Sequence, residues 1–320
     1  MAKVLVTGVA GFVGSHLCDS YLREGHEVIG IDNMSSGFEE NLRNAEQQNS
    51  FSFFNVDITE PSSLEKIFSG VDIVVHMAAN ADIRGGLHKP GYDLQQNTIA
   101  THNVLEAMRI NGVKRIIFAS SAAALGEPSE FPTPENCATP LQTSLYGASK
   151  MACEGLISAY CEGFGIEGYI FRFVSLLGPR YPHGHVIDFV KQLRKNPGSL
   201  VVLGDGTQKK SYLHVEDCVE AIRLVEQKRT ATSAKHNVQI YNLGSDAFIT
   251  VKQSVSFICD SLNLSPKIQY GQGNKGWVGD NPFVFLDTSK IKSEGWRAKH
   301  DIESAIRATV EWLDKNSPLV

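Results

Sequence analysis

Residues 3–14 read Lys-Val-Leu-Val-Thr-Gly-Val-Ala-Gly-Phe-Val-Gly, and this stretch decides the fold of the first half of the chain. A short β-branched run ends at Thr7, and glycines follow at positions 8, 11 and 14, where the apolar spacing becomes that of a helix. A strand that turns so tightly into a helix leaves backbone N–H groups at the positive helix end, where a pyrophosphate binds. Glycine permits the turn, the approach of the phosphate and close helix–strand packing.

An acidic residue after the next strand strengthens this signal, because three glycines alone are a weak one. The second predicted strand, residues 27–31, is followed directly by Asp32. A carboxylate there accepts hydrogen bonds from the adenosine ribose hydroxyls and repels a 2′-phosphate. Since no arginine stands at position 33 or 34, the sequence predicts a site for NAD rather than NADP.

The composition is that of an ordinary globular protein. The 320 residues are 42% apolar and 20% charged, with a formal net charge of −5, and this length predicts about two domains. The charge and the lack of a Lys/Arg cluster argue against nucleic acid or a membrane as a partner. No apolar run reaches the roughly 18 residues that span a bilayer, and no signal-peptide pattern is present. With six scattered cysteines and no Cys-x-x-Cys pair, we expect a cytoplasmic protein with reduced thiols and no metal site.

Strand and helix patterns alternate through the first half of the chain. Strands separated by helices form a parallel sheet through right-handed crossovers, with helices on both faces. The predicted fold class is therefore α/β, a doubly wound parallel sheet of the Rossmann type with a smaller α/β lobe. The predicted strands are 3–7, 27–31, 51–55, 71–76, 115–120 and 168–173, and the predicted helices are 11–23, about 62–68, about 91–111 and about 145–163.

This alternation stops after residue 173, where a smaller lobe is predicted to begin. We expect the first domain to comprise 1–174 plus about 211–245, and the lobe to comprise about 175–210 plus 246–320. Ligands of doubly wound sheets bind beyond the carboxyl ends of the strands. The polar or small residues at or just past those ends are Gly8, Asp32, Asp57, Ala78 and Ser121.

The segment Tyr146-Gly-Ala-Ser-Lys150 is the second strong signal, because residues four apart lie on one face of a helix. Keeping a phenol ionised at pH 7 costs about 4 kcal/mol. A nearby ammonium group and the charged nicotinamide ring of NAD lower that cost. Tyr146 then becomes a base that takes a hydroxyl proton as hydride leaves the same carbon.

A serine hydroxyl at the end of the strand that precedes this helix can bind the same substrate oxygen. Ser120 and Ser121 both stand there. The structural alternatives are a serine that caps a loop and a tyrosine packed under a lysine stem.

Together these motifs resemble the extended short-chain dehydrogenase/reductases, in particular the nucleotide-sugar epimerase/dehydratase group and the UDP-glucose (UDP-galactose) 4-epimerases within it. The resemblance covers essentially the whole chain. It implies that NAD stays bound throughout the reaction. Hydride leaves C4 of a UDP-hexose, the 4-keto intermediate rotates about its diphosphate linkage, and hydride returns to the other face of the sugar. Tyr146 is implied as base and then acid, Ser121 as its hydrogen-bond partner, and Lys150 as the group that tunes the tyrosine.

The resemblance also implies two sets of binding residues. The set for NAD is Gly8, Gly11, Phe12, Val13, Gly14, Asp32, Asn33, Ser36, Gly37, Asp57, Ile58, Met77, Ala78, Ala79, Asn97, Tyr146, Lys150 and Phe173. The set for the nucleotide sugar is Arg84, Ser121, Ser175, His185, Val186, Leu203, Lys210 and Asp280.

Several positions depart from the family pattern and leave the substrate open. Ala122-Ala123 replaces the Asp-Glu that follows the catalytic hydroxyl in 4,6-dehydratases, which argues against that reaction. Ser175 replaces a phosphate-binding asparagine, and Lys210 and Trp277 replace two arginines that clamp the diphosphate. The alternatives are another nucleotide-sugar modification (dehydratase, 4-ketoreductase or epimerase at another carbon) and, more remotely, a non-catalytic dinucleotide sensor.

A homodimer is the last expectation that the resemblance implies. Its interface would be formed by the helices near 97–111 and 145–163. Their apolar faces would serve equally well as core within one chain.

Overall fold

The computed structural model describes residues 1–80, 82–138, 141–228, 237–276, 281 and 283–316. The chain divides into two compact units. Unit 1 comprises Met1–Gly126, Ser144–Arg172 and Glu226–Tyr241, and unit 2 comprises Glu127–Thr143, Phe173–Val225 and Asn242–Val320. None of the helices in the described residues combines the length and apolar character that a bilayer crossing requires.

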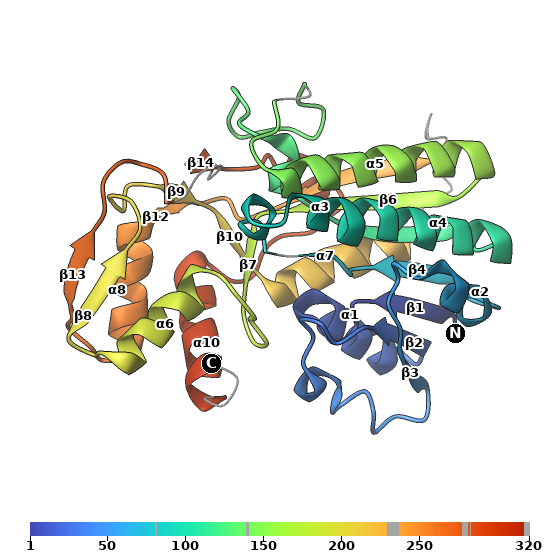
Figure 1. The fold of residues 1–320 in the computed structure, drawn as a ribbon, viewed down its shortest axis with the longest axis horizontal. Helices are drawn as coiled ribbons and strands as arrows, with labels where there is room; N and C mark the ends of the chain where they lie inside the picture. Colours follow the sequence, from blue (N-terminus) through green and yellow to red (C-terminus); the bar gives the residue numbers. More distant parts are fainter. Residues whose placement is uncertain (81, 139–140, 229–236, 277–280, 282, 317–320) are drawn as a thin grey trace. The chain divides into compact units, whose positions relative to one another are not determined.

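Unit 1 is built on a seven-stranded sheet with the order β11-β6-β5-β4-β1-β2-β3 (Figure 1). β1 pairs in parallel with β2 and β4, and the pairs β2–β3 and β4–β5 are also parallel. The strand order reverses between β1 and β4, which is where ligands of such sheets bind. The strands are β1(Lys3–Thr7), β2(Glu27–Asp32), β3(Phe51–Asn55), β4(Ile73–His76), β5(Arg115–Ser121), β6(Glu167–Phe173) and β11(Val238–Leu243).

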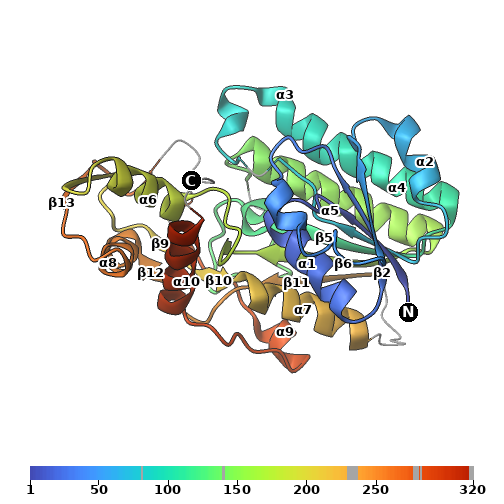
Figure 2. The same ribbon diagram turned by 90° about the horizontal axis from the view of Figure 1, so that it is seen from below.

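Helices cover both faces of this sheet (Figures 1 and 2). α4(Ala100–Asn111) and α5(Leu145–Phe164) lie over one face, and α1(Phe12–Arg23) lies over the other. On the first face, Leu5 of β1 shares a buried core with Val104 of α4 and Ile157 of α5. On the second, Leu17 and Tyr21 of α1 are completely buried. The predicted doubly wound α/β fold is confirmed.

The catalytic candidates lie on α5, whose two ends are fixed by local chemistry. The Ser144 hydroxyl accepts a hydrogen bond from the Gly147 N–H at 3.0 Å and caps the start of the helix. Gly165, with φ +63°, ends it in the left-handed conformation that glycine adopts without strain. Tyr146 therefore lies in the first turn of a 20-residue helix.

The single helix predicted over about 91–111 is wrong in detail, because three segments replace it. They are α3(Pro90–Asp93), the π-helical segment η4(Leu94–Ile99) and α4. A π-helix has i→i+5 hydrogen bonds, and such segments occur often at functional sites. The other short helices of unit 1 are η1(Glu39–Leu42), η2(Pro61–Ser63), α2(Leu64–Ile67), η3(Gly85–Leu87) and η5(Ala122–Leu125).

Unit 2 combines small sheets with helices. β10 pairs in parallel with β7, and β13 pairs in parallel with β8. The helices are α6(His185–Lys195), α7(Val215–Lys228), α8(Val251–Ser261), α9(Ser289–Ser293) and α10(Ile302–Lys315). The strands are β7(Ser175–Leu177), β8(Ser199–Val202), β9(Lys209–Lys210), β10(Tyr212–His214), β12(Ile249–Thr250), β13(Lys267–Tyr270) and β14(Phe283–Val284). The sequence-based assignment of about 211–245 to the first domain stays a prediction.

The helix faces considered for a dimer interface are largely occupied within the chain. Ala100, Val104, Ala107 and Ile157 all belong to the buried core of unit 1, whereas Ala152 is exposed. The homodimer stays a prediction.

Replacing glycine by alanine should have opposite effects on the free energy of unfolding in the glycine turn and in the interior of α5. In Gly14→Ala the new methyl carbon would lie 2.1 Å from the carbonyl oxygen of Gly8, so the backbone must shift and the free energy of unfolding should fall by about 1–3 kcal/mol. The matched control is Gly155→Ala in α5, where nothing lies within 4 Å of the new atom. That change should raise the free energy of unfolding by roughly 0.5–1 kcal/mol. Chemical denaturation measures both, and equal effects would contradict the geometry.

Candidate active site

The turn after β1 is held closely against the neighbouring strands. The Gly8 N–H donates to the Ile31 carbonyl at 2.8 Å. Gly8 has φ +67°, and a Cβ there would lie 2.8 Å from the backbone of Ala78. Together with the lack of room at Gly14, this leaves a turn of bare backbone at the start of α1. Backbone of this kind, at the positive end of a helix, fits a pyrophosphate.

Asp32 stands at the end of β2 and is fixed by the backbone. Its Oδ2 accepts from the Ala10 N–H at 3.0 Å, and its Oδ1 accepts from the Met34 N–H at 2.9 Å. A side chain on Gly37 would come within 3.1 Å of the same Oδ1. Burial raises the pKa of Asp32, against the two hydrogen bonds that lower it. This constrained carboxylate fits the ribose contact predicted for it.

Asp57 and Asn33 lie next to this position and contact each other. The Asn33 amide donates to Asp57 Oδ2 at 2.9 Å, and the Thr59 N–H and hydroxyl both donate to Asp57 Oδ1. Burial raises the pKa of Asp57, but these hydrogen bonds outweigh burial and lower it overall. Of the other residues predicted to bind NAD in this region, Ile58 is buried, Phe12, Val13, Met77, Ala78 and Ala79 are half-buried, and Ser36 is exposed.

Tyr146, Ser121 and Lys150 come together where β5 meets α5. The Ser121 hydroxyl is hydrogen-bonded to Tyr146 and also accepts from the Ala123 N–H at 3.1 Å. Lys150 is only 2% exposed, and its Nζ donates to the Ala119 carbonyl at 2.8 Å. That nitrogen lies 5.9 Å from the centre of the Tyr146 ring. Of the two candidate serines, the structure therefore brings Ser121 to the tyrosine.

The protein's own groups do not make Tyr146 acidic. Burial raises its pKa to about 12, and the Ser121 hydrogen bond opposes this rise. Burial also lowers the pKa of Lys150 to about 8, although Cys153, Glu154 and Asp93 raise it. The sequence predicts that Lys150 stabilises the phenolate, yet the Lys150 ammonium donates to the Ala119 carbonyl. Within the protein it is Ser121 that favours the ionised tyrosine.

Asn97 braces the first turn of α5 from the π-helical segment. Its amide donates to the Ser149 hydroxyl at 2.8 Å, and Ser149 donates to the Tyr146 carbonyl at 2.7 Å. The Asn97 oxygen accepts from the Asn80 N–H, and the Asn80 amide donates to Asp93 at 2.8 Å. The backbone that carries Tyr146 is thus connected to Asp93, a completely buried carboxylate that the sequence analysis missed.

A second buried chain of hydrogen bonds connects the glycine turn with α5. Thr7 lies 2.7 Å from His76 Nδ1, and His76 Nε2 lies 3.0 Å from the Thr101 hydroxyl. Because the Thr101 hydroxyl donates to the Cys153 sulfur, His76 must donate from Nε2 and accept at Nδ1. Burial and the charge of Lys150 lower the pKa of His76 to about 3, so the ring is neutral. In the sequence, His76 ends the predicted strand 71–76 and directly precedes Met77, Ala78 and Ala79 of the predicted NAD set.

The residues predicted to bind the nucleotide sugar are spread over both units. Arg84 is an exposed residue of unit 1. In unit 2, Ser175 and Leu203 are exposed and Val186 is completely buried. His185 Nε2 lies 2.7 Å from the Ser254 hydroxyl, and Lys210 donates to the Asn281 carbonyl. Asp280, with Trp277, lies outside the described residues. Phe173, predicted to bind NAD, ends β6.

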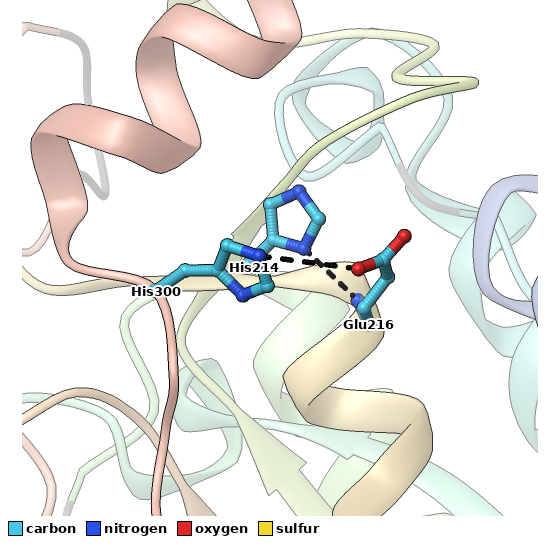
Figure 3. A group of neighbouring side chains, drawn as sticks. All are labelled: His214, Glu216 and His300. Atoms are coloured by element: carbon cyan, nitrogen blue, oxygen red, sulfur yellow. Dashed lines mark hydrogen bonds and ion pairs between the residues drawn. The ribbon is translucent and has the colours of Figure 1, made fainter.

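One cluster of unit 2 has the residue types of a metal site but not the geometry (Figure 3). His300 Nε2 lies 3.9 Å from a Glu216 carboxylate oxygen, and His214 Nδ1 already accepts from the Glu216 N–H. The two imidazoles are stacked, with centres 4.1 Å apart and planes inclined by 26°. A metal ion lies near the plane of each imidazole that binds it, and the planes of two rings stacked in this way meet only well away from their nitrogen atoms. The cluster is therefore not arranged to hold a metal ion.

Comparison with known proteins agrees with the geometry of unit 1. The profile of the family described as "NAD dependent epimerase/dehydratase family" matches residues 4–244. A putative UDP-glucose 4-epimerase of Methanocaldococcus jannaschii is 32% identical over 98% of this chain and 99% of its own length. A UDP-glucuronate 4-epimerase of Thermodesulfobacterium geofontis is 28% identical over all of this chain and 98% of its own.

A solved structure shows the same similarity in three dimensions. The crystal structure of a UDP-glucose 4-epimerase from Thermus thermophilus in complex with NAD superposes with a TM-score of 0.83, at 30% identity. The superposition covers 98% of this chain and 99% of that one. NAD as cofactor and the enzyme class expected from the sequence, a nucleotide-sugar epimerase, are thereby confirmed. The chain belongs to the NAD-dependent epimerase/dehydratase family.

Proposed function

We propose that this enzyme interconverts a UDP-hexose and its C4 epimer through a transient 4-keto sugar. The observation that carries the proposal is the hydrogen bond between Ser121 and Tyr146 beside the buried Lys150. These three groups come together at the carboxyl end of β5, the edge at which doubly wound sheets bind their ligands.

The chain's residues divide the work of this reaction. Tyr146, as phenolate, takes the proton of the sugar 4-hydroxyl and later returns it to the 4-keto oxygen. Ser121 donates to the same oxygen and stabilises the charge that develops on it. Bound NAD would supply the hydride acceptor and donor for C4 of the sugar and a positive ring charge beside Tyr146. The turn at Gly8–Gly14 and the Asp32 carboxylate would hold its pyrophosphate and ribose.

The choice of UDP and of C4 rests on the relatives. A UDP-glucose 4-epimerase and a UDP-glucuronate 4-epimerase share the nucleotide and the reacting carbon but differ at C6 of the sugar. In this chain, Lys210 is proposed to offer the diphosphate a point charge, since the lysine ammonium lacks the two-pronged geometry of an arginine. Because Ala122 and Ala123 directly follow Ser121, those positions provide no acid for loss of a C6 hydroxyl.

A panel of nucleotide sugars tests the proposal. Purified protein without added cofactor is incubated with UDP-glucose, UDP-galactose, UDP-glucuronate and UDP-N-acetylglucosamine, and products are identified by NMR. We expect C4 epimers of at least one. A keto, unsaturated or C3-, C5-epimerised product, or no product from any of the four, would overturn the proposal.

Replacing the base tests its role directly. Tyr146→Phe removes the proton acceptor but keeps the ring, so we expect kcat to fall by about 10²–10⁴-fold with NAD still bound. The matched control is Tyr160→Phe on the same helix, whose hydroxyl donates to Glu106 at 2.6 Å. This control should keep kcat within about twofold, since the loss of one part-buried hydrogen bond has a small net effect. Full activity of Tyr146→Phe would rule out the assigned base.

The pH dependence of kcat/KM follows from the number of protons that Tyr146 and Lys150 hold together. The active form holds a proton on Lys150 and none on Tyr146, so the pair must lose one proton in total. Since burial lowers the pKa of Lys150 to about 8, that first proton leaves at or below this pH. kcat/KM should therefore rise about tenfold per pH unit at low pH and level off by about pH 8. A profile between pH 6 and 10 that still rises tenfold per unit above pH 9 would contradict this assignment.

A further inference from the structure

Glu154 lies one helical turn after Lys150 on α5 and is buried, at 7% exposure. Its carboxylate forms a two-pronged ion pair with Arg172 of β6, with Nε–Oε1 at 3.0 Å and Nη2–Oε2 at 2.7 Å. Arg172 is also 7% exposed. Two parallel hydrogen bonds fix the geometry of this pair. Separating the partners would leave each as an uncompensated buried charge, so the carboxylate is held in place.

The same carboxylate holds a third group. The Ser120 hydroxyl of β5 donates to Glu154 Oε1 at 2.5 Å, and Ser120 is only 3% exposed. The residues on either side of Ser120 are the ones that contact the catalytic pair. The Ala119 carbonyl accepts from Lys150, and the Ser121 hydroxyl bonds Tyr146. Ser120 is thus the fixed point between two catalytic contacts.

We propose that Glu154, held by Arg172, is a positioning residue that acts through Ser120 to fix the 119–121 segment of β5 against Tyr146 and Lys150. The inference rests on the proposed function, since it assumes that these two residues act on the substrate. Neither Glu154 nor Arg172 is expected to touch the sugar. Together they determine where the Ala119 carbonyl and the Ser121 hydroxyl stand, and a displacement of about 1 Å in such a site lowers the rate about 10²-fold.

The charge of Glu154 has a second effect that a purely mechanical role would lack. The charged and titratable groups around Lys150 are Tyr146, Cys153 and Glu154 on α5, His76 on β4, Asp93 on α3, and Arg172 behind Glu154. Of these, Cys153, Glu154 and Asp93 each favour the protonated amine. The carboxylate among them that pairs with Arg172 is Glu154. Removing its charge while Arg172 stays should lower the pKa of Lys150.

Three variants test the proposal. Ser120→Ala removes only the link to β5 and should lower kcat about tenfold or more, with KM within about twofold and the pH profile unmoved. Glu154→Gln should lower kcat similarly and move the levelling-off of kcat/KM down by roughly one pH unit. Glu154→Gln/Arg172→Gln removes both charges, so the profile should return toward that of the parent while kcat stays low. Ser158→Ala is the matched control, since its hydroxyl donates only to the Glu154 backbone carbonyl.

The outcomes separate this inference from the proposed function. Tyr146→Phe with full activity defeats the proposed function itself. If Tyr146→Phe is inactive but Ser120→Ala and Glu154→Gln keep the parent kcat and pH profile, the positioning role alone is wrong. If Glu154→Gln does not fold, Ser120→Ala decides, because it leaves the ion pair intact. Loss of kcat in Ser158→Ala equal to that in Ser120→Ala would also overturn the proposal.

Discussion

The hydrogen-bond chain from Thr7 through His76 and Thr101 to Cys153 is the interaction on which the active site most depends. It crosses the buried interior of unit 1 from the strand that begins the glycine turn to the helix that carries Tyr146. Every donor in it has one acceptor, so the neutral ring of His76 has a single tautomer. In a low-dielectric interior such a network tolerates little displacement, because any break leaves a polar group without a partner. The cofactor turn and the catalytic helix are therefore held in one frame.

Much of unit 1 could be predicted from the sequence, because its elements are long and their periodicity is regular. The predicted strand 3–7 and helix 145–163 match β1 and α5 to within one residue. In unit 2 the prediction was weaker. β8 and β13 are short and were not predicted, since Ser199–Val202 and Lys267–Tyr270 acquire strand structure only by pairing with each other. The π-helical segment was also missed, because Leu94–Ile99 has no breaker residue to mark it.

The residues of the candidate active site also divide into those that the sequence predicts and those that only the structure reveals. Tyr146 and Lys150 could be found from spacing along one helix, and Asp32 from its place after a strand. Glu154 carries a sequence signal too, since it repeats the four-residue spacing once more, but only the pairing with Arg172 gives that spacing a meaning. Asp93 and His76 have no such pattern, because their partners come from other elements. Buried polar residues are recognised by what surrounds them, which one-dimensional patterns do not record.

The widened turn at Leu94–Ile99 has a geometric consequence for the residues around it. A π-turn holds one more residue than an α-turn, so side chains four positions apart are nearly eclipsed along the helix axis instead of staggered. Asp93 and Asn97 are four positions apart, and Asn80 bonds to both. Its side-chain amide donates to Asp93, and its backbone N–H donates to the Asn97 side-chain oxygen. In a regular α-helix the two groups would be turned about 40° apart around the helix axis, so Asn80 would meet them at different angles. The extra residue in this turn thus sets the direction from which the Asn97 side chain reaches Ser149 of α5.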